Sequence, residues 1–377
     1  MTLAHISDTH LGKVQFPRNN PSGINQRTID VLVNFRANLD SISGRKPDLV
    51  LHTGDLFDKV KPDNHTIVQV ARSVRAFQAE RDNAPFVLCG GNHDSPQKVI
   101  DGNIQQLIGD IPGVYFAGNM STRFDITELD CEVLCVPSNS LRTGENVAYI
   151  PSLGRAHSVL CVHGMASQAL PKEVDIKHAA YDVNDLHTSL FSYVGLGDFH
   201  GHQVYAPNCC FAGSTDFTSS NFWDEVKLPK GWVWFDTEIG KLEHVAVPTR
   251  EVIDLPSIDA DALSPDELRA AIQAQAVWEG QPIVRQKVIN LHPSDKRALF
   301  STSFVREIGA RALNYQLVTT PPAFDRGTGQ ISTVAPEAKT LEVQWSAHAS
   351  ECPIPKTVER EALIASGLEL LKEAACA

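Results

Sequence analysis

The sequence lacks the features that would place it in a membrane or in a secretory pathway. None of its apolar runs approaches the roughly 18 residues that a membrane-spanning helix needs. The first residues, MTLAHISDTH, contain no basic segment followed by an apolar one, and so do not resemble a secretion signal. From these two observations we expect a cytoplasmic protein.

Paired cysteines and basic clusters are also missing. The eight cysteines show neither a CxxC pair nor the spacing of a zinc ribbon, and several lie in apolar runs such as VLCVP, so we expect reduced thiols. No dense run of Lys and Arg occurs, and the net charge is −12. Because phosphate binding draws on clustered basic residues, any contact with DNA must use local patches or bound cations.

The length of 377 residues suggests two domains. In the first half, strand patterns (TLAHISD, PDLVLHTGD, APFVLCGGNHD) alternate with helix patterns at 26–42 and 64–81, the second with Asn64 as its cap. This alternation predicts a largely parallel sheet with covered faces. From about 123 to 236 the chain is rich in strand patterns, which end with GWVWFD and predict a second sheet packed on the first.

A boundary falls near 246–258. Ser264, Pro265 and Glu267 then form a capping box that opens a helix. With IVRQKVINLH as a strand, TSFVREIGARAL as a helix and NYQLVTT as a strand, this segment predicts a small α/β module. A loop-like stretch at 319–338 follows, and a last helix at about 357–375 carries Ile364, Leu368 and Leu371 on one face.

Polar clusters follow five of the predicted strands. They are SDTH with Asp8 and His10, TGDLFD with Asp55, GGNHD with Asn92 and His93, VHG with His163, and GLGDFHGH with Asp198, His200 and His202. The carboxyl ends of parallel strands converge, so we expect these side chains to meet. Their mixture of oxygen and nitrogen ligands favours Mn²⁺, Mg²⁺, Fe or Zn²⁺. One Asp could bridge two such ions about 3.5–4 Å apart, an arrangement that serves phosphoryl transfer.

Other polar residues have simpler explanations. His5 and His52 lie inside strand patterns and are expected to be structural. Asp58 and Asp94 are expected to fix loops through backbone hydrogen bonds. A single GD dipeptide is a common turn, and only the order of all five clusters, each after a strand, argues for a metal centre.

This series resembles the calcineurin-like metallophosphoesterase superfamily, and within it the SbcD-type nucleases of DNA double-strand-break repair. The narrower resemblance rests on HISDTHLG, QRTIDVLVNF, KPDLVLHTGDLFDKVKPD, GGNHDSP, FAGSTDFTS and KGWVWFD. It covers about residues 1–240 well and the small α/β module only in pattern. It implies a four-layer αββα sandwich over 1–248, a small α/β capping domain over 249–337 that shapes DNA access, and a linker with a C-terminal helix over 338–377 that could dock on an ATPase.

Carried over residue by residue, the resemblance implies two divalent cations, with Mn²⁺ first among the candidates. Asp8, His10 and Asp55 would hold one ion, with Asp55 bridging, and Asn92 and His163 would hold the second. His93 would protonate the leaving oxygen or stabilise the transition state. The partners implied are DNA ends, single-stranded DNA, an SbcC-like SMC-type ATPase and a second copy of the chain.

The last cluster departs from the family pattern. SbcD-type proteins end the site with G-H-x-H, whereas this chain reads Gly197-Asp198-Phe199-His200. Either Asp198 and His200 complete the site, or a two-residue slip makes His200 and His202 the pair. The flanking VGLG and QVYA keep the family spacing, and sheet register resists slipping. We therefore favour Asp198 on the second ion and His200 on the first, with His202 nearby.

Three functions remain open on the sequence. The first is a manganese-dependent exonuclease or endonuclease acting on DNA ends in double-strand-break repair. The second is a stand-alone phosphodiesterase or phosphatase for small substrates, which the negative charge favours. The third is a scaffold protein with a weakened site that supports an ATPase partner.

Overall fold

The computed structural model describes residues 1–96, 98, 102–167, 180–261, 263–293, 295–296, 302–324, 331–332, 345–346, 348–350 and 359–376. Most of the loop predicted at 319–338 lies outside these residues. Within these ranges no helix is long and apolar enough to cross a membrane. The chain divides into two compact units, of which the first holds 1–254, 278–285 and 308–316, and the second holds the rest.

The first unit contains a six-stranded mixed sheet in the order β14-β13-β1-β2-β3-β4. Four of its strands run parallel, as the sequence predicts: β1 (Thr2–Ile6), β2 (Leu49–His52), β3 (Phe86–Cys89) and β4 (Val114–Ala117). At one edge, β13 (Gly231–Asp236) pairs antiparallel with β1, and β14 (Lys241–Ala246) pairs antiparallel with β13.

A second six-stranded sheet has the order β11-β12-β10-β7-β6-β5. Its central strands are again parallel: β12 (Cys209–Phe211), β10 (Tyr193–Gly197), β7 (His157–His163) and β6 (Cys131–Val136). Its two edges are antiparallel, formed by β11 (Gln203–Ala206) and β5 (Thr122–Ile126). The protein is therefore an α/β protein with two mixed sheets.

The strand GWVWFD belongs to the first sheet, so its predicted place in the second is wrong. It forms β13 and pairs with β1, with Thr2 opposite Asp236 and His5 opposite Val233. Trp232 faces the helix side of this sheet, whereas Val233 and Phe235 face the other sheet. Because the strand is apolar on both faces, its pattern fits either sheet, and only the pairing with β1 decides between them.

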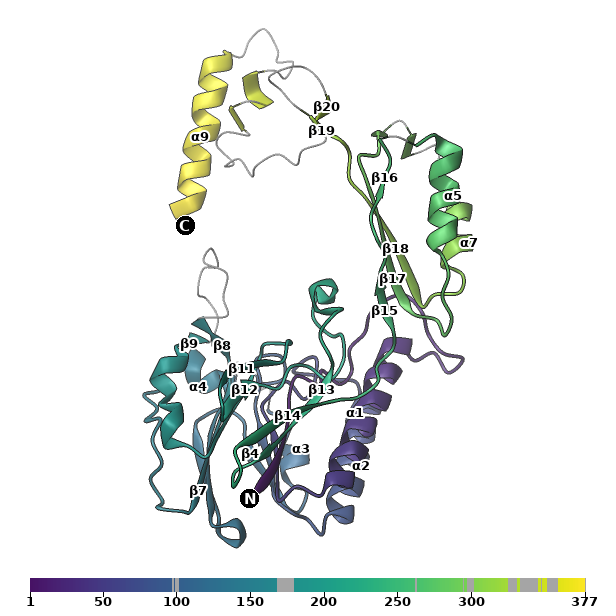
Figure 1. The fold of residues 1–377 in the computed structure, drawn as a ribbon. Helices are drawn as coiled ribbons and strands as arrows, with labels where there is room; N and C mark the ends of the chain where they lie inside the picture. The colour runs from purple at the N-terminus through teal and green to yellow at the C-terminus, as the bar shows by residue number, and fades with distance from the viewer. Residues whose placement is uncertain are drawn as a thin grey trace. The chain divides into compact units, whose positions relative to one another are not determined.

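Two long helices cover the outer face of the first sheet (Figure 1). α1 (Gln26–Arg45) includes the helix predicted at 26–42; it buries Leu32, Phe35 and Leu39 and leaves Val33 exposed. α2 (Asn64–Glu80) is capped by Asp63, whose side chain accepts from the backbone of Thr66, so the expected cap at Asn64 is wrong by one residue. The short α3 (Gln106–Gly109) precedes β4.

The two sheets pack against each other through apolar strand faces, with residues such as Leu51 and Val87 from the first and Val133 and Val159 from the second. The outer face of the second sheet is covered by short elements. They are α4 (Ser138–Arg142), the 3-10 turns Val183–Leu186 and Thr188–Leu190, and the strand pair β8 (Met165–Ala166) and β9 (Ala180–Tyr181).

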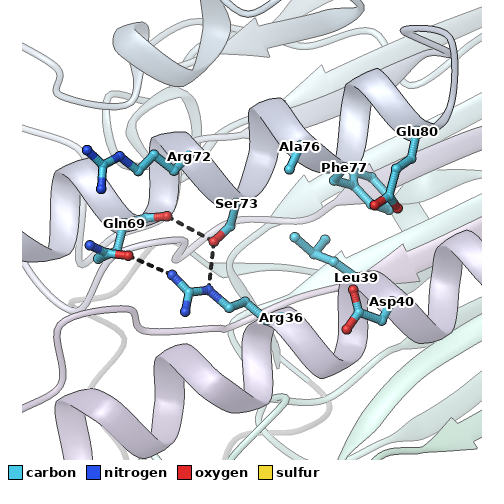
Figure 2. Close-up of a pocket in the computed structure, with 9 residues that line it drawn as sticks. All are labelled: Arg36, Leu39, Asp40, Gln69, Arg72, Ser73, Ala76, Phe77 and Glu80. Atoms are coloured by element: carbon cyan, nitrogen blue, oxygen red, sulfur yellow. Dashed lines mark hydrogen bonds between the residues drawn. The ribbon is translucent and has the colours of Figure 1, made fainter.

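Polar contacts join α1 and α2 across the groove between these two helices (Figure 2). The Arg36 guanidinium donates to Gln69 Oε1 at 2.7 Å and to Ser73 Oγ at 3.0 Å, and the apolar side chains of Leu39 and Phe77 also line the groove. None of the residues that line it belongs to the predicted metal clusters, so we interpret it as packing between helices.

The predicted α/β segment contains the elements expected of it. β15 (Val252–Asp254) pairs with Ile283–Arg285 of β17 (Ile283–Ile289), and β16 (Ile258–Asp259) pairs with its last two residues. The capping box of Ser264 and Glu267 opens α5 (Pro265–Gln275), as predicted. The remaining elements are α7 (Thr302–Gly309), β18 (Asn314–Thr319), β19 (Ala323–Phe324), β20 (Ile331–Ser332) and α9 (Arg360–Cys376).

The last helix packs against a short neighbouring segment of the second unit. Ile364, Leu368 and Leu371 of α9 are half-buried, as their shared face predicts. The Trp345 indole donates to the Ile364 carbonyl at 3.1 Å. Gly367 provides the space for this ring, because a Cβ there would lie 2.2 Å from Trp345.

His5 is a buried histidine of the core, as predicted. Its Nδ1 lies 2.9 Å from the Tyr193 hydroxyl and its Nε2 lies 2.9 Å from Thr53 Oγ1. Burial, with smaller contributions from the imidazoles of His202 and His52, lowers the pKa of His5 from 6.5 to about 3. Between these two values the unfolded chain binds a proton that the folded protein does not, so stability falls as the pH falls.

We predict that His5→Gln makes the protein less sensitive to acid. Removing one titrating group should lower the pH dependence of the free energy of unfolding by about 1.4 kcal/mol per pH unit across the acid range. Urea unfolding at several pH values measures this slope, with His65→Gln on the exposed surface of α2 as the control. Equal slopes for His5→Gln and the wild type would contradict the assignment.

Candidate metal centre

The predicted clusters meet at the carboxyl ends of strands from both sheets. Asp8 and His10 follow β1, Asp55 follows β2, and Asn92 and His93 follow β3. His163 ends β7, and Asp198 and His200 follow β10. Three overlapping trios have ligand atoms within 4.8 Å of one another: Asp8, His10 and His200; His10, Asp55 and His93; Asp8, Asp55 and His163.

In the first group two imidazole nitrogens face each other. His10 Nε2 and His200 Nε2 lie 3.1 Å apart, and both rings are buried or nearly so. Asp8 accepts from Ser7 Oγ at 2.5 Å and from the backbone N–H of Asp198 at 3.2 Å, which fixes its carboxylate beside them. Two neutral nitrogens in this position present lone pairs to each other unless a proton or a cation lies between them.

The second group is a set of hydrogen-bond acceptors. The Asn92 side-chain oxygen lies 2.9 Å from His163 Nε2 and 3.1 Å from both Asp55 Oδ2 and Asp198 Oδ1. His163 Nδ1–H donates to the Thr53 carbonyl at 2.6 Å, which leaves a lone pair on Nε2 of the neutral ring. Turning the Asn92 amide would aim two hydrogens at three acceptors and leave one unsatisfied. A cation satisfies all four atoms, so these residues fit a metal ion.

Asp55 lies between the two groups. Its Oδ2 is 3.6 Å from His10 Nε2 and 3.6 Å from His163 Nε2, whereas Oδ1 accepts from the His93 backbone N–H at 2.9 Å. Burial raises the pKa of Asp55, but the imidazoles of His163 and His10 outweigh this and lower it below its usual range. Its carboxylate is therefore ionised and turned toward both groups.

The backbone at the cluster adopts conformations that side chains rarely accept. Asp8 has φ 50°, His10 has φ 44°, Asp55 has φ 53° and Asp198 has φ 94°. Such residues cost free energy and persist where the surrounding structure enforces them, which is common at functional sites. Gly91 permits the close approach of the β3 loop, because a Cβ there would lie 2.0 Å from Asp55 Oδ1.

Protons compete for the same positions. Burial raises the pKa of Asp8 to about 6, aided by Asp55 and opposed by His163 and His10. Burial lowers the pKa of His163, but the carboxylates of Asp55, Asp8 and Asp198 raise it well above its usual value. The cluster therefore attracts positive charge strongly, and a bound cation must displace the proton from His163.

Comparison with known proteins decides the family. The calcineurin-like phosphoesterase family matches residues 1–215, more than half of the chain, and this range holds every residue of the cluster. The chain belongs to the calcineurin-like phosphoesterase family. Its two mixed sheets agree with that fold, and its clusters of histidine and carboxylate imply divalent metals.

Several relatives of this phosphoesterase are DNA repair proteins. It is 28% identical over 204 residues to the DNA double-strand break repair protein Mre11 of Sulfurisphaera tokodaii, covering 54% of this chain and 50% of the relative. It is 26% identical over 273 residues to Mre11 of Methanococcus maripaludis, covering 67% and 68%. It is 22% identical over 285 residues to a subunit of the SbcCD nuclease from Staphylococcus epidermidis, covering 69% and 73%.

The chain thus spans only half of the length of the first of these relatives. The phosphoesterase is distantly homologous to the Mre11 and SbcD nucleases, in agreement with the resemblance seen in the sequence.

The phosphoesterase brings Asp198 to the cluster and leaves His202 outside it. Asp198 Oδ1 lies 3.7 Å from His163 Nε2. His202 Nδ1–H donates to the Phe211 carbonyl at 2.9 Å, and its ring lies 4.7 Å from the His244 ring. In the described part of the chain His202 belongs to none of the possible ligand groups.

Two acidic residues near the cluster play different parts. Asp94 accepts from the backbone N–H groups of Gly91 and Phe57 at 3.0 Å, which confirms its predicted role in fixing loops. The same expectation for Asp58 is wrong, because its side chain accepts from Lys13 Nζ at 3.0 Å and faces His10 Nδ1 at 3.5 Å.

His52 is a core histidine, with Nε2 3.2 Å from Thr9 Oγ1.

Two buried basic residues near the site were not predicted from the sequence. Lys230 is buried and donates to the His200 carbonyl at 3.0 Å, to Ser214 Oγ at 2.8 Å and to Glu225 Oε2 at 2.5 Å. Arg27 of α1 is fully buried and donates to Asp216 Oδ1 at 3.0 Å. The sequence offers two signals for them: Lys230 comes directly before an apolar strand, and Arg27 lies on the buried side of a helix.

A further group of possible ligands is a set of core thiols. Cys89, Cys135 and Cys161 lie within the apolar layer between the two sheets. The Cys89 thiol donates to the Gly90 carbonyl at 3.8 Å, as a protonated sulfur does. Six cysteines are free and buried, in agreement with the predicted reduced state, whereas Cys352 lies outside the described residues.

The cluster opens into a cleft of about 510 Å³. His10, Asp55, His93, Asp198 and His200 line it on the metal side. Its other walls are formed by Lys13, Phe199, Gly201, Thr218, Ser219, Ser220, Asn221, Asp224, Glu225 and Leu228. A substrate therefore has direct access to the ligand groups and to His93.

We predict that Gly91→Ala disrupts the centre. The new methyl group would collide with the carboxylate and backbone of Asp55, which must then move away from both groups. Manganese binding, followed by the electron paramagnetic resonance (EPR) signal of free Mn²⁺, should weaken at least about tenfold. The control is Gly44→Ala in α1, where a Cβ meets nothing within 4 Å. Wild-type binding by Gly91→Ala would contradict this geometry.

We predict that Asp198→Ala and His202→Ala differ in metal binding. Asp198 faces the acceptor group, so its loss should weaken binding of one of two Mn²⁺ ions, whereas His202→Ala should bind both as the wild type does. Mn²⁺ stoichiometry measured on both variants decides the question. If only His202→Ala lost an ion, the alternative pair of His200 and His202 would be correct.

Proposed function

We propose that this phosphoesterase is a two-cation nuclease that hydrolyses phosphodiester bonds at DNA ends in double-strand-break repair. The observation that carries the proposal is Asp55, whose Oδ2 faces His10 on one side and His163 on the other, both at 3.6 Å. One carboxylate oxygen facing two ligand groups would let Asp55 serve two cations, as in the two-metal sites that carry out phosphoryl transfer.

Two sets of residues would hold the cations. Asp8, His10 and His200 with Asp55 would hold the first, and Asn92, His163 and Asp198 with the same Asp55 would hold the second. Three carboxylates and an amide oxygen among the donors favour Mn²⁺ over softer ions. When bound, the cations activate water and neutralise charge that develops on the phosphate.

His93 is suited to proton transfer at the leaving oxygen. Its Nδ1–H donates to the Asp58 carbonyl at 3.1 Å, so Nε2 is the nitrogen that can exchange a proton with a substrate. Its ring lies 4.7 Å from the His10 ring and lines the open cleft. We infer that His93 delivers a proton to the departing sugar oxygen and holds no metal itself.

DNA is favoured over a small substrate by homology and by the open cleft. The relatives are named as DNA repair proteins and as part of a nuclease, and these align with up to 69% of this chain. We propose that residues 249–337 act as a capping domain for DNA access within a four-layer αββα nuclease architecture over 1–248. We further propose that 338–377 docks on an SbcC-like ATPase and that the protein acts as a homodimer inside the cell.

The net charge of −12 favours the alternative of a small-substrate phosphodiesterase. The cations would offset this charge where the substrate binds. A scaffold with a weakened site is disfavoured, because the predicted ligand residues lie together and five residues of the predicted site line one cleft: His10, Asp55, His93, Asp198 and His200.

We predict that the purified protein with Mn²⁺ cleaves linear duplex or single-stranded DNA, and that His93→Ala lowers the rate by about 100-fold or more while Mn²⁺ binding persists. His65→Ala, on the exposed surface of α2, is the matched control. An aryl phosphodiester is tested in parallel. Fast turnover of this ester without DNA cleavage would contradict the nuclease proposal. Inactivity on every substrate would favour the alternative of a scaffold protein with a weakened site.

A further inference from the structure

The three inward-facing imidazoles are supported in different ways. His10 and His200 belong to the first cation position, and His163 belongs to the second. In each ring Nε2 faces the cluster, so Nδ1 is the atom that the rest of the protein can hold. The group behind Nδ1 sets the tautomer and the donor strength of Nε2.

His10 is backed by a lysine–carboxylate pair. Asp58 Oδ1 lies 3.5 Å from His10 Nδ1, and the same oxygen accepts from Lys13 Nζ at 3.0 Å. His10 Nδ1 is buried and makes no hydrogen bond among the described residues. Asp58 is therefore the acceptor within reach of this N–H, directly or through one water.

His200 is backed by the same combination from another part of the chain. Glu225 Oε1 lies 4.0 Å from His200 Nδ1, which is also buried without a hydrogen bond in the described part of the chain. Glu225 Oε2 accepts from Lys230 Nζ at 2.5 Å, and Oε1 accepts from Ser219 Oγ at 2.5 Å. The carboxylate is thus held in place behind the ring.

His163 is backed by a neutral group. Its Nδ1–H donates to the Thr53 backbone carbonyl at 2.6 Å. A carboxylate that accepts from Nδ1 of an imidazole makes Nε2 a stronger metal ligand than a neutral carbonyl does. The reason is that the negative charge of the carboxylate stabilises the ring when the ring gives up electron density to a cation. The two cation positions therefore differ in ligand strength.

We propose that Asp58 and Glu225 are positioning residues that make the position of Asp8, His10 and His200 the tighter of two cation positions. This inference rests on the proposed two-cation function and adds an order of filling to it. Lys13 and Lys230 keep each carboxylate behind its ring. The second position, which contains Asn92, Asp198 and a carbonyl-backed histidine, then exchanges its cation more readily.

The test is a Mn²⁺ titration of the full chain, with free Mn²⁺ followed by EPR. The wild type should show one tight and one weaker class of site. Asp58→Asn and Glu225→Gln should each weaken the tight class by about 10- to 100-fold and leave the weaker class unchanged. The control is Asp224→Asn, an exposed carboxylate of the same cleft that accepts from Asn221. It should bind as the wild type does.

The outcomes separate this inference from the proposed function. A wild type that binds fewer than two Mn²⁺ ions would overturn the two-cation proposal itself. Two classes of site that Asp58→Asn and Glu225→Gln leave unchanged would overturn only the positioning role. Equal weakening of both classes, together with a lower melting temperature of the cation-free variants, would show a merely structural role. Weaker Mn²⁺ binding by Asp224→Asn would show a general effect of charge and would also overturn the positioning role.

Discussion

The convergence of carboxylate, amide and imidazole atoms at one buried point is the constraint on which this structure depends. The Asn92 oxygen lies within hydrogen-bonding distance of three atoms: Asp55 Oδ2, Asp198 Oδ1 and His163 Nε2. Nearby, the Nε2 atoms of His10 and His200 lie 3.1 Å apart. Burying such groups unpaired costs several kcal/mol or more. Cations or trapped protons relieve this cost, and family membership points to cations.

The centre exists only when both sheets are in place. The first sheet supplies the loops with Asp8, Asp55 and Asn92, and the second supplies those with His163 and Asp198. The apolar layer between the sheets therefore fixes distances across the site. Asp8 and Asp55 have left-handed backbone conformations, which persist where the surrounding structure enforces them.

Much of the site could be predicted from the sequence because its ligands follow apolar strands, whose carboxyl ends meet at one edge. The position of Asp198 in the cluster also agrees with the spacing of its flanks. Glu225 could not be found in this way, because it approaches His200 through a tertiary contact from a segment without a motif. Lys230 begins the KGWVWFD motif, but its contact with the His200 carbonyl is also tertiary and leaves no spacing pattern in the sequence. The sheet to which β13 belongs could not be predicted either, because a strand that is apolar on both faces carries no signal for its partner.

Anomalous scattering tests the central claim most directly. Crystals grown with Mn²⁺ and measured at the manganese absorption edge should show two adjacent peaks. One should lie among Asp8, His10 and His200, the other among Asn92, His163 and Asp198, with the Asp55 carboxylate between them. A single peak, or peaks away from Asp55, would contradict the account.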